Sequence, residues 1–208
     1  MRQPAVSPAQ DAVFLNIPYD SGFRTLYVAY IVGLVFLEFK PHATLGLPGG
    51  TRRLDKIFQE IQACPYSIHD LSRVEADRTP PFATPRFNMP FELGLAVGWA
   101  KMNPKNHMWF IFESKAYRVQ KSLSDLNGSD PHIHDCQVKG VLRELNNAFV
   151  RTRNRPTIPE MMKAYRLVSR RQFEIAKAAG AKSLFEASAF QGLCYAAKVA
   201  ADDVRRSG

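Results

Sequence analysis

Cysteine is scarce in this 208-residue chain and is poorly spaced for cross-links. The three cysteines, Cys64, Cys136 and Cys194, are far apart and odd in number. Such a set provides neither a disulfide framework nor the close pairs typical of a zinc site. We therefore expect a reducing, cytoplasmic setting and no metal site or cofactor.

Long apolar runs are also lacking. The most hydrophobic stretch, residues 26–37, is flanked by Arg24 on one side and by Glu38 and Lys40 on the other. It is too short to span a bilayer and suits a buried helix. The first residues, MRQPAVSPAQDAVF, have no apolar segment after a basic end. We therefore expect no secretory signal and no membrane association.

The common nucleotide-binding and nucleophile fingerprints are missing. No glycine-rich loop has a lysine at the Walker spacing, and no GxGxxG occurs. Ser-His-Asp and Cys-His nucleophile arrangements have no local signature. Basic residues do not alternate with aromatic ones in a recognisable nucleic-acid motif, so nucleic acid is not the expected partner.

Acidic side chains are sparse in the last quarter of the chain. Residues 151–208 hold 12 basic and 5 acidic side chains, a net +7, whereas residues 1–150 hold 16 and 14, a net +2. A solvated helical face is the usual meaning of such a charge run. Nucleic acid, an acidic partner, or an acidic surface on another copy of the chain are the alternatives.

Short apolar segments alternate with helical patterns through the first 150 residues. Strands are expected at residues 12–18, 42–47, 66–72 and 107–114, and helices at 23–39, 52–64, 88–101 and 138–150. Continuous apolar strands are typical of a parallel sheet covered on both faces. We predict an α/β fold, an open flavodoxin-like (Rossmann-like) parallel sheet over residues 1–155, with ligands beyond the carboxyl ends of its strands.

A pair of helices is expected after the boundary near residue 155. Thr157 with Glu160, and Ser183 with Glu186, match the capping-box pattern and predict helices over 158–178 and 184–204. This basic C-terminal helical extension, residues 156–208, either folds back on the sheet or forms an assembly surface. We expect it to support self-association or a protein partner through apolar residues at helical spacing: Met161, Tyr165, Val168, Leu184, Phe185 and Leu193.

Polar residues at the ends of the expected strands, or directly after them, mark the binding site. The candidates that contact a nucleotide ligand are Asn16, Tyr19, Asp20, Asp70 and Ser72. Asp70 can equally begin an Asx turn.

Two glycines precede the second expected helix. Gly49 and Gly50 leave backbone N–H groups exposed next to the start of that helix, where a phosphate can bind. An ordinary glycine turn is the alternative.

Glu92 is the one carboxylate in the apolar stretch from Met89 to Ala100. We expect Asn88 to be the N-cap of a helix and also to contact the ligand. Glu92 then lies about one turn inside that helix. Its helical neighbours Leu95, Ala96 and Trp99 are apolar, so it lies on an apolar face.

Several roles for Glu92 are possible. It can complement the helix dipole, pair with Arg73 or Arg86, or stand at the mouth of a ligand cleft, and we favour the cleft because an unpaired buried charge is costly. Gly94 and Gly98 are expected to allow the helix to pack closely on the sheet.

The segments HDLS (69–72) and NMPFELGLAVGWAK (88–101) carry a family resemblance. A strand ending in Asp-Leu-Ser, then a variable loop and a helix with an E-x-G-x-A pattern, resembles the nucleoside 2-deoxyribosyltransferases and the bacterial TIR-like domains that share their fold. The resemblance covers roughly residues 12–150 and implies that Glu92 is the catalytic glutamate.

This resemblance implies cleavage of an N-glycosidic bond. NAD is the expected substrate or ligand, with release of nicotinamide; transfer of a nucleoside's deoxyribose is one alternative. A sensor or signalling adaptor that binds a nucleotide without turnover is another. TIR-like enzymes commonly assemble to complete their sites, which implies a homo-oligomer.

HIHDC contains one further candidate. His132 and His134 stand near Asp135 and Cys136 and could together bind a metal. Histidines in a polar loop are more often simply exposed, and we assign no metal site to them.

Overall fold

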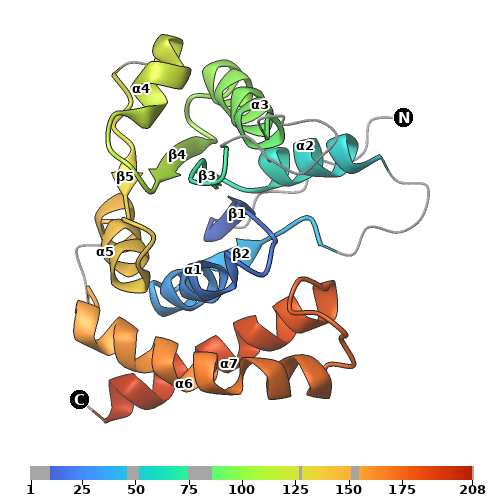
Figure 1. Ribbon diagram of the computed structural model, residues 1–208, viewed down its shortest axis with the longest axis vertical. Helices are drawn as coiled ribbons and strands as arrows, with labels where there is room; N and C mark the ends of the chain where they lie inside the picture. Colours follow the sequence, from blue (N-terminus) through green and yellow to red (C-terminus); the bar gives the residue numbers. More distant parts are fainter. Residues whose placement is uncertain (1–9, 46–51, 75–85, 127, 151–154, 208) are drawn as a thin grey trace.

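A five-stranded parallel sheet forms the centre of the molecule, as the computed structural model in Figure 1 shows. The structure describes residues 10–45, 52–74, 86–126, 128–150 and 155–207. The strands lie in the order β2-β1-β3-β4-β5, and every neighbouring pair is parallel. Their bounds are β1 Ala12–Asn16, β2 Lys40–His42, β3 Tyr66–Asp70, β4 Met108–Glu113 and β5 His132–Ile133. The predicted α/β, flavodoxin-like sheet is confirmed.

Helices cover both faces of the sheet (Figure 1). One face holds α2 (Arg53–Ala63) and α3 (Asn88–Met102), and the other holds α1 (Arg24–Phe36) and α5 (Val138–Ala148). The short α4 (Arg118–Ser122) and a 3-10 turn (Ser124–Leu126) connect β4 to β5. None of the helices in the described ranges combines the length and apolar character that crossing a bilayer requires.

Helix α1 is buried on almost every side, which explains why its sequence is apolar without a polar stripe. It lies against α5 so closely that a Cβ on Gly33 would be 2.5 Å from Leu145 Cδ1. A side chain at this position would have to displace the end of the Leu145 side chain. The other side of α1 is covered by the C-terminal pair, α6 (Ile158–Ala178) and α7 (Ala187–Arg206).

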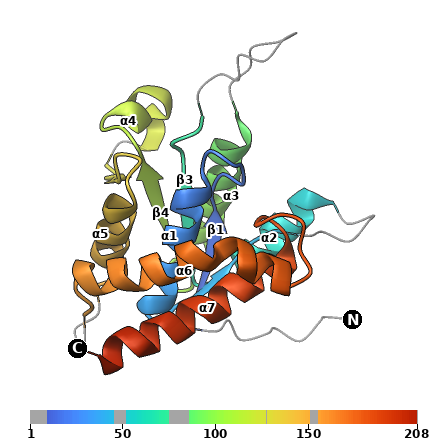
Figure 2. The ribbon, with the colours of Figure 1, turned by 60° about the horizontal axis from the view of Figure 1, so that its bottom comes forward.

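The C-terminal pair forms a third layer over α1 (Figure 2). One continuous apolar cluster contains residues of β1, α1, α5, α6 and α7, so the boundary expected near residue 155 does not divide the core. The apolar residues that we expected to support assembly pack inside the chain. Met161, Val168, Leu184 and Leu193 are buried, and Tyr165 and Phe185 pack against the same cluster.

Helix starts are partly as expected. Thr157 caps α6 with a complete capping box, because its Oγ1 accepts from Glu160 N and its own N–H donates to the Glu160 carboxylate. Helix α7 begins at Ala187 and not at residue 184, because Glu186 accepts from the backbone of Ser183 in a preceding turn.

Other local expectations were wrong. Asn88 is the first residue of α3 and not its N-cap, which is Phe87. A Cβ at Gly94 or Gly98 would meet nothing within 4 Å, so these glycines face open space and do not serve close packing.

The strand boundaries also differ from the prediction. Strand β2 lies at residues 40–42, earlier than expected, beside β1 at the sheet edge, where Pro41 is tolerated. Strand β5 was missed because it has only two residues in a polar, turn-rich stretch.

Candidate functional site

A cleft of about 740 Å³ opens at the carboxyl end of β1. The chain leaves β1 for β2 on one side, and β3 lies on the other, so this is the point at which strand order reverses and ligands bind in open α/β sheets. Its volume is in the range of small-molecule sites. The cleft is lined by Leu15, Asn16, Ile17, Pro18, Tyr19, Thr44, Leu45, Arg53, Arg73, Arg86, Phe87, Asn88, Met89, Glu92 and Phe185.

Glu92 lies in this cleft, on the first turns of α3, with 8% of its surface exposed. Its carboxylate accepts no hydrogen bond and forms no ion pair within the described part of the chain; Arg73 and Arg86, the partners considered as an alternative, bind Asp20. Burial raises the pKa of Glu92 to about 7, and the positive charge of Arg53 opposes that rise. A carboxylate that titrates near neutrality in a cleft is a candidate for chemistry.

Asn16 ends β1 beside Glu92, at one end of a buried chain of hydrogen bonds. His107 Nδ1 donates to the carbonyl oxygen of Cys64 (2.8 Å), so His107 Nε2 accepts from Ser67 Oγ (2.9 Å). Ser67 Oγ in turn accepts from His69 Nε2 (3.0 Å), which leaves His69 Nδ1 to accept from Asn16 Nδ2 (2.9 Å).

Burial keeps the two imidazoles in this series of hydrogen bonds, those of His69 and His107, neutral. It lowers the pKa of His69 to about 3 and also lowers that of His107. Each ring therefore holds one proton, and the roles of the donors and acceptors are fixed. Because Asn16 Nδ2 faces His69 and also lies 3.5 Å from the Met89 carbonyl oxygen, Asn16 Oδ1 is left to accept from a ligand.

Arginines give the cleft a positive wall. Arg73 and Arg86 both bind Asp20, at 2.9 Å to Oδ1 and 3.3 Å to Oδ2. Asp20 therefore holds two arginines at the mouth and is not among the residues that line the cleft. Arg53, at the start of α2, has no ion-pair partner within the described ranges and is exposed.

Tyr19 also lines the cleft and contacts the residues around it. Its hydroxyl donates to the carbonyl oxygen of Leu15 (2.7 Å), and its ring contacts those of Tyr27 and Phe185 edge-on. Burial raises the pKa of Tyr19 well above its ordinary value. Its hydroxyl therefore stays protonated and positions backbone and aromatic groups around the ligand space.

Asp70 and Ser72 lie outside the cleft. Asp70 is fully buried at the end of β3, where Tyr30 Oη donates to its Oδ2 (2.7 Å) and the backbone N–H of Ser72 donates to its Oδ1 (2.9 Å). The Ser72 hydroxyl binds the same oxygen, and His134 Nε2 lies 3.1 Å from Oδ2. This is the Asx-type turn that the sequence left open, and it ties β3 to α1 and to the segment after β5.

The two histidines of HIHDC go to different partners. His134 is fully buried next to Asp70, whereas His132 Nδ1 lies 3.3 Å from Glu144 Oε2. They are not simply exposed, as expected of a polar loop, but they do not converge on one point. Of the other expected contact residues, Asn88 lines the cleft, while Gly49 and Gly50 lie outside the described residues.

Sequence reasoning missed Arg53, Phe87 and Phe185. Arg53 follows the glycine-containing loop in sequence, so its place at a strand-to-helix connection was a usable signal. Phe87, 68% exposed, precedes the helix and offers a ring at the cleft mouth. Phe185 comes from the turn before α7, and no pattern in the sequence links that turn to β1.

Comparisons of the chain with protein-family models, with curated proteins and with solved structures found no match. The chemistry of the site therefore follows from its own residues. It combines one carboxylate that has no partner among the described residues, an amide oxygen, three arginines and aromatic rings, a set suited to an anionic ligand that also has hydroxyl groups and a planar base.

Proposed function

We propose that the protein cleaves the N-glycosidic bond of a nucleotide, NAD, with release of nicotinamide, and that Glu92 is the catalytic carboxylate. The observation that carries the proposal is the isolation of Glu92, which is buried in the cleft without a hydrogen-bond partner among the described residues. A structural glutamate at such a position would be expected to have one. The resemblance to TIR-like and deoxyribosyltransferase proteins agrees with this assignment.

The reaction needs a negative charge beside the sugar. As the C1′–N bond breaks, its electron pair moves onto the nicotinamide nitrogen, which leaves neutral, and the ribose develops oxocarbenium character. Ionised Glu92 stabilises this cation or attacks C1′. Water then bonds to C1′ and releases a proton, giving ADP-ribose; where Glu92 has attacked, the bond from its carboxylate to C1′ breaks as water adds.

The other residues of the cleft supply binding and orientation. Arg53, Arg73 and Arg86 provide positive charge for the diphosphate, since guanidinium groups bind phosphate oxygens in pairs. Asn16 Oδ1 accepts from a ribose hydroxyl, and Phe87 offers its ring to a base.

The charge of NAD suits the raised pKa of Glu92. The nicotinamide ring of NAD is cationic, and a cation next to a carboxyl group lowers its pKa. Binding of the substrate would therefore ionise the carboxyl that is half protonated near pH 7 in the unliganded cleft.

A nucleoside substrate is the second candidate, and the same pKa favours it. A neutral base leaves more easily when it is protonated, and a carboxyl group with a pKa of about 7 can donate that proton at neutral pH. In that reaction the cleft would transfer or hydrolyse the sugar of a nucleoside.

Product analysis with NAD and with purine and pyrimidine deoxyribonucleosides tests the proposal. We expect nicotinamide release from NAD, loss of at least about 100-fold in kcat for Glu92→Gln, and no loss for Glu174→Gln, an exposed glutamate on α6. Base release from nucleosides alone would identify the second candidate.

Binding without turnover would contradict the enzyme proposal. Calorimetry with NAD and ADP-ribose detects that case, in which the protein is a nucleotide sensor or adaptor. Saturable binding that Glu92→Gln leaves intact, with no product at any protein concentration, would assign the cleft to recognition alone.

A further inference from the structure

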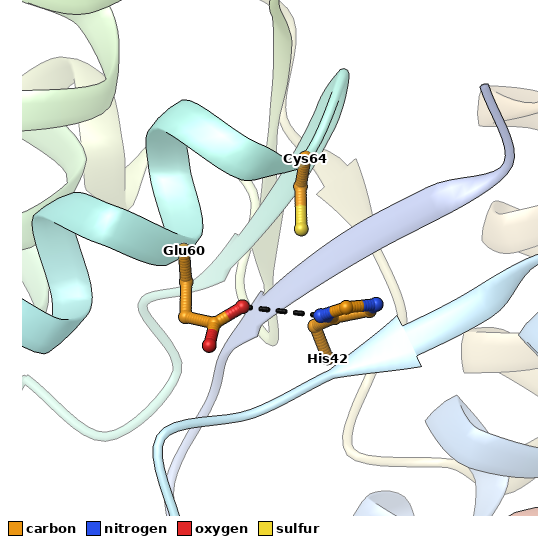
Figure 3. Close-up of side chains that lie close together, drawn as sticks. All are labelled: His42, Glu60 and Cys64. Atoms are coloured by element: carbon orange, nitrogen blue, oxygen red, sulfur yellow. Dashed lines mark hydrogen bonds and ion pairs between the residues drawn. The ribbon is translucent and has the colours of Figure 1, made fainter. Parts of the chain in front are cut away.

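Three metal-ligating side chains of different kinds converge outside the cleft, on the face of the sheet that α2 covers (Figure 3). His42 ends β2, Glu60 lies on the last turn of α2, and Cys64 follows that helix. Their ligand atoms all lie within 4.8 Å of one another. His42 Nδ1 is 3.1 Å from Glu60 Oε2, and the Cys64 side chain points toward that pair.

We infer that His42, Glu60 and Cys64 form a binding site for one divalent transition-metal ion, zinc being the ion that this donor set fits best. Imidazole nitrogen, carboxylate oxygen and thiolate sulfur are all zinc ligands, at about 2.0–2.3 Å from the ion. In a tetrahedral site the atoms of such ligands are roughly 3.3–3.7 Å apart. Side-chain rotations that move the ligand atoms by about an ångström would bring the three to these separations.

The backbone already holds Cys64 in place. Its N–H donates to the Glu60 carbonyl oxygen (3.0 Å), and its carbonyl oxygen accepts from His107 Nδ1 (2.8 Å). Cys64 is 1% exposed, and its thiol makes no hydrogen bond within the described part of the chain. The thiol is held beside an imidazole and a carboxylate but is hydrogen-bonded to neither. It is therefore placed where it can bind a metal ion together with them.

The second carboxylate oxygen of Glu60 is bound by Lys56, which is not one of the three ligands. Lys56 Nζ is 2.8 Å from Glu60 Oε1, whereas His42 contacts Oε2. The ion can therefore bind Oε2 while Lys56 keeps Oε1, an outer contact of the kind that orients metal-bound carboxylates. The His42 side chain is 41% exposed, so a water molecule can reach the fourth position.

Such an ion would connect the end of β2 to the end of α2. The segment between them carries Thr44, Leu45 and Arg53, which line the cleft. Binding would stabilise the folded chain because the unfolded chain does not bring the three ligands together. The site itself does not depend on the reaction proposed for the cleft.

Metal titration of the 208-residue chain, stripped with a chelator, tests the inference. We expect one zinc ion per chain, a higher melting temperature with zinc, and, with cobalt(II), a thiolate charge-transfer band and the visible bands of a tetrahedral ion. Cys64→Ser should lose the charge-transfer band, and His42→Asn should bind zinc at least about tenfold more weakly. Cys136→Ser, an exposed cysteine elsewhere, should behave as wild type.

Two results would overturn the inference. The first is a cobalt band that persists in Cys64→Ser or disappears in Cys136→Ser. The second is zinc affinity in His42→Asn equal to that of wild type. Because His42 is on the exposed sheet edge, its variant should fold normally, so it decides the question even if Cys64→Ser does not fold.

Discussion

At the scale of single residues, Glu92 imposes a cost on the folded protein at neutral and alkaline pH. Its pKa is about 7 in the fold and about 4.5 in an unfolded chain. Between these values the unfolded chain loses a proton that the folded protein keeps, so stability falls as pH rises from about 4.5 through 7. The difference corresponds to at most about 3 kcal/mol.

Glu92→Gln should remove this cost. We expect the variant to melt at the same temperature as wild type near pH 4.5, and several degrees higher at pH 8, because the amide has no charge to bury. Calorimetric scans at both pH values provide the measurement, with Glu174→Gln as the control. A variant less stable than wild type at pH 8 would mean that Glu92 has a structural partner.

Arg53 should set the pH at which the site becomes active. Its positive charge lowers the pKa of Glu92, against the larger effect of burial. If the ionised carboxylate is required, kcat/KM rises with pH through that pKa. Arg53→Gln should move the rise to more alkaline pH, whereas Arg171→Gln on the exposed face of α6 should not. An unchanged profile would separate Arg53 from the reacting group.

Residues of the site were predictable where one strand or helix explains them. Asn16 ends a strand, Tyr19 follows it, and Glu92 interrupts an apolar helix, so these signals are local. Arg53 also follows a strand-to-helix loop, whereas Phe185 belongs to a distant segment and reaches the cleft only because the chain folds. Asp70 has the right position in sequence, but its side chain is turned inward by Tyr30.

At the scale of the elements, the junction of β5 with α5 is under the tightest steric control. A Cβ on Gly140 would lie 2.1 Å from the carbonyl oxygen of His134, and backbone atoms cannot move aside as a flexible side chain can. Asp135 and Cys136 between them both have positive φ. Helix α5 can begin directly after this turn because the residue that faces the His134 carbonyl group, Gly140, has no side chain.

Gly140→Ala should therefore destabilise the protein. We expect about 1–3 kcal/mol, the usual cost of overpacking, from denaturant unfolding followed by far-ultraviolet circular dichroism. Gly94→Ala on α3 is the control, since its Cβ would meet open space and alanine is the better helix former. Equal stabilities for the two variants would contradict the packing described for this turn.

The elements themselves were predictable to different degrees. The buried helix α1 and the apolar strands β1, β3 and β4 have strong patterns, and all were expected. Strand β5 has two residues and is defined by pairing with β4, and β2 is short and contains a proline. Such elements exist because a neighbouring strand pairs with them, which a sequence pattern does not encode.

At the scale of the whole molecule, α6 and α7 complete the core and are not an appendage. They cover the side of α1 that faces away from the sheet, and Arg205 Nη2 donates to the carbonyl oxygen of Phe36 (2.7 Å). Without them, the apolar surface of α1 would be open to water.

A protein that ends at Arg155 should therefore aggregate or lose cooperative unfolding. Burying an apolar side chain contributes about 1.5–3 kcal/mol, and several on α1 would be exposed together. Solubility, light scattering and thermal melting measure this, with removal of residue 208 alone as the control. A soluble, monomeric fragment with a sharp transition would restore the separate domain that the sequence predicted.

The series of hydrogen bonds from Cys64 to Asn16 has a fixed direction, because each group in it is either a donor or an acceptor toward the next. A backbone carbonyl at one end of the sheet determines, through His107, Ser67 and His69, which atom of Asn16 a ligand meets at the other. Ser67→Ala should break this transmission: His69 is then free to protonate Nδ1, and the Asn16 amide turns over to present N–H. Nitrogen chemical shifts of the His69 ring would record the exchange of tautomers. The cleft would then prefer ligands that accept hydrogen bonds over ligands that donate them, although no residue of the cleft had been changed.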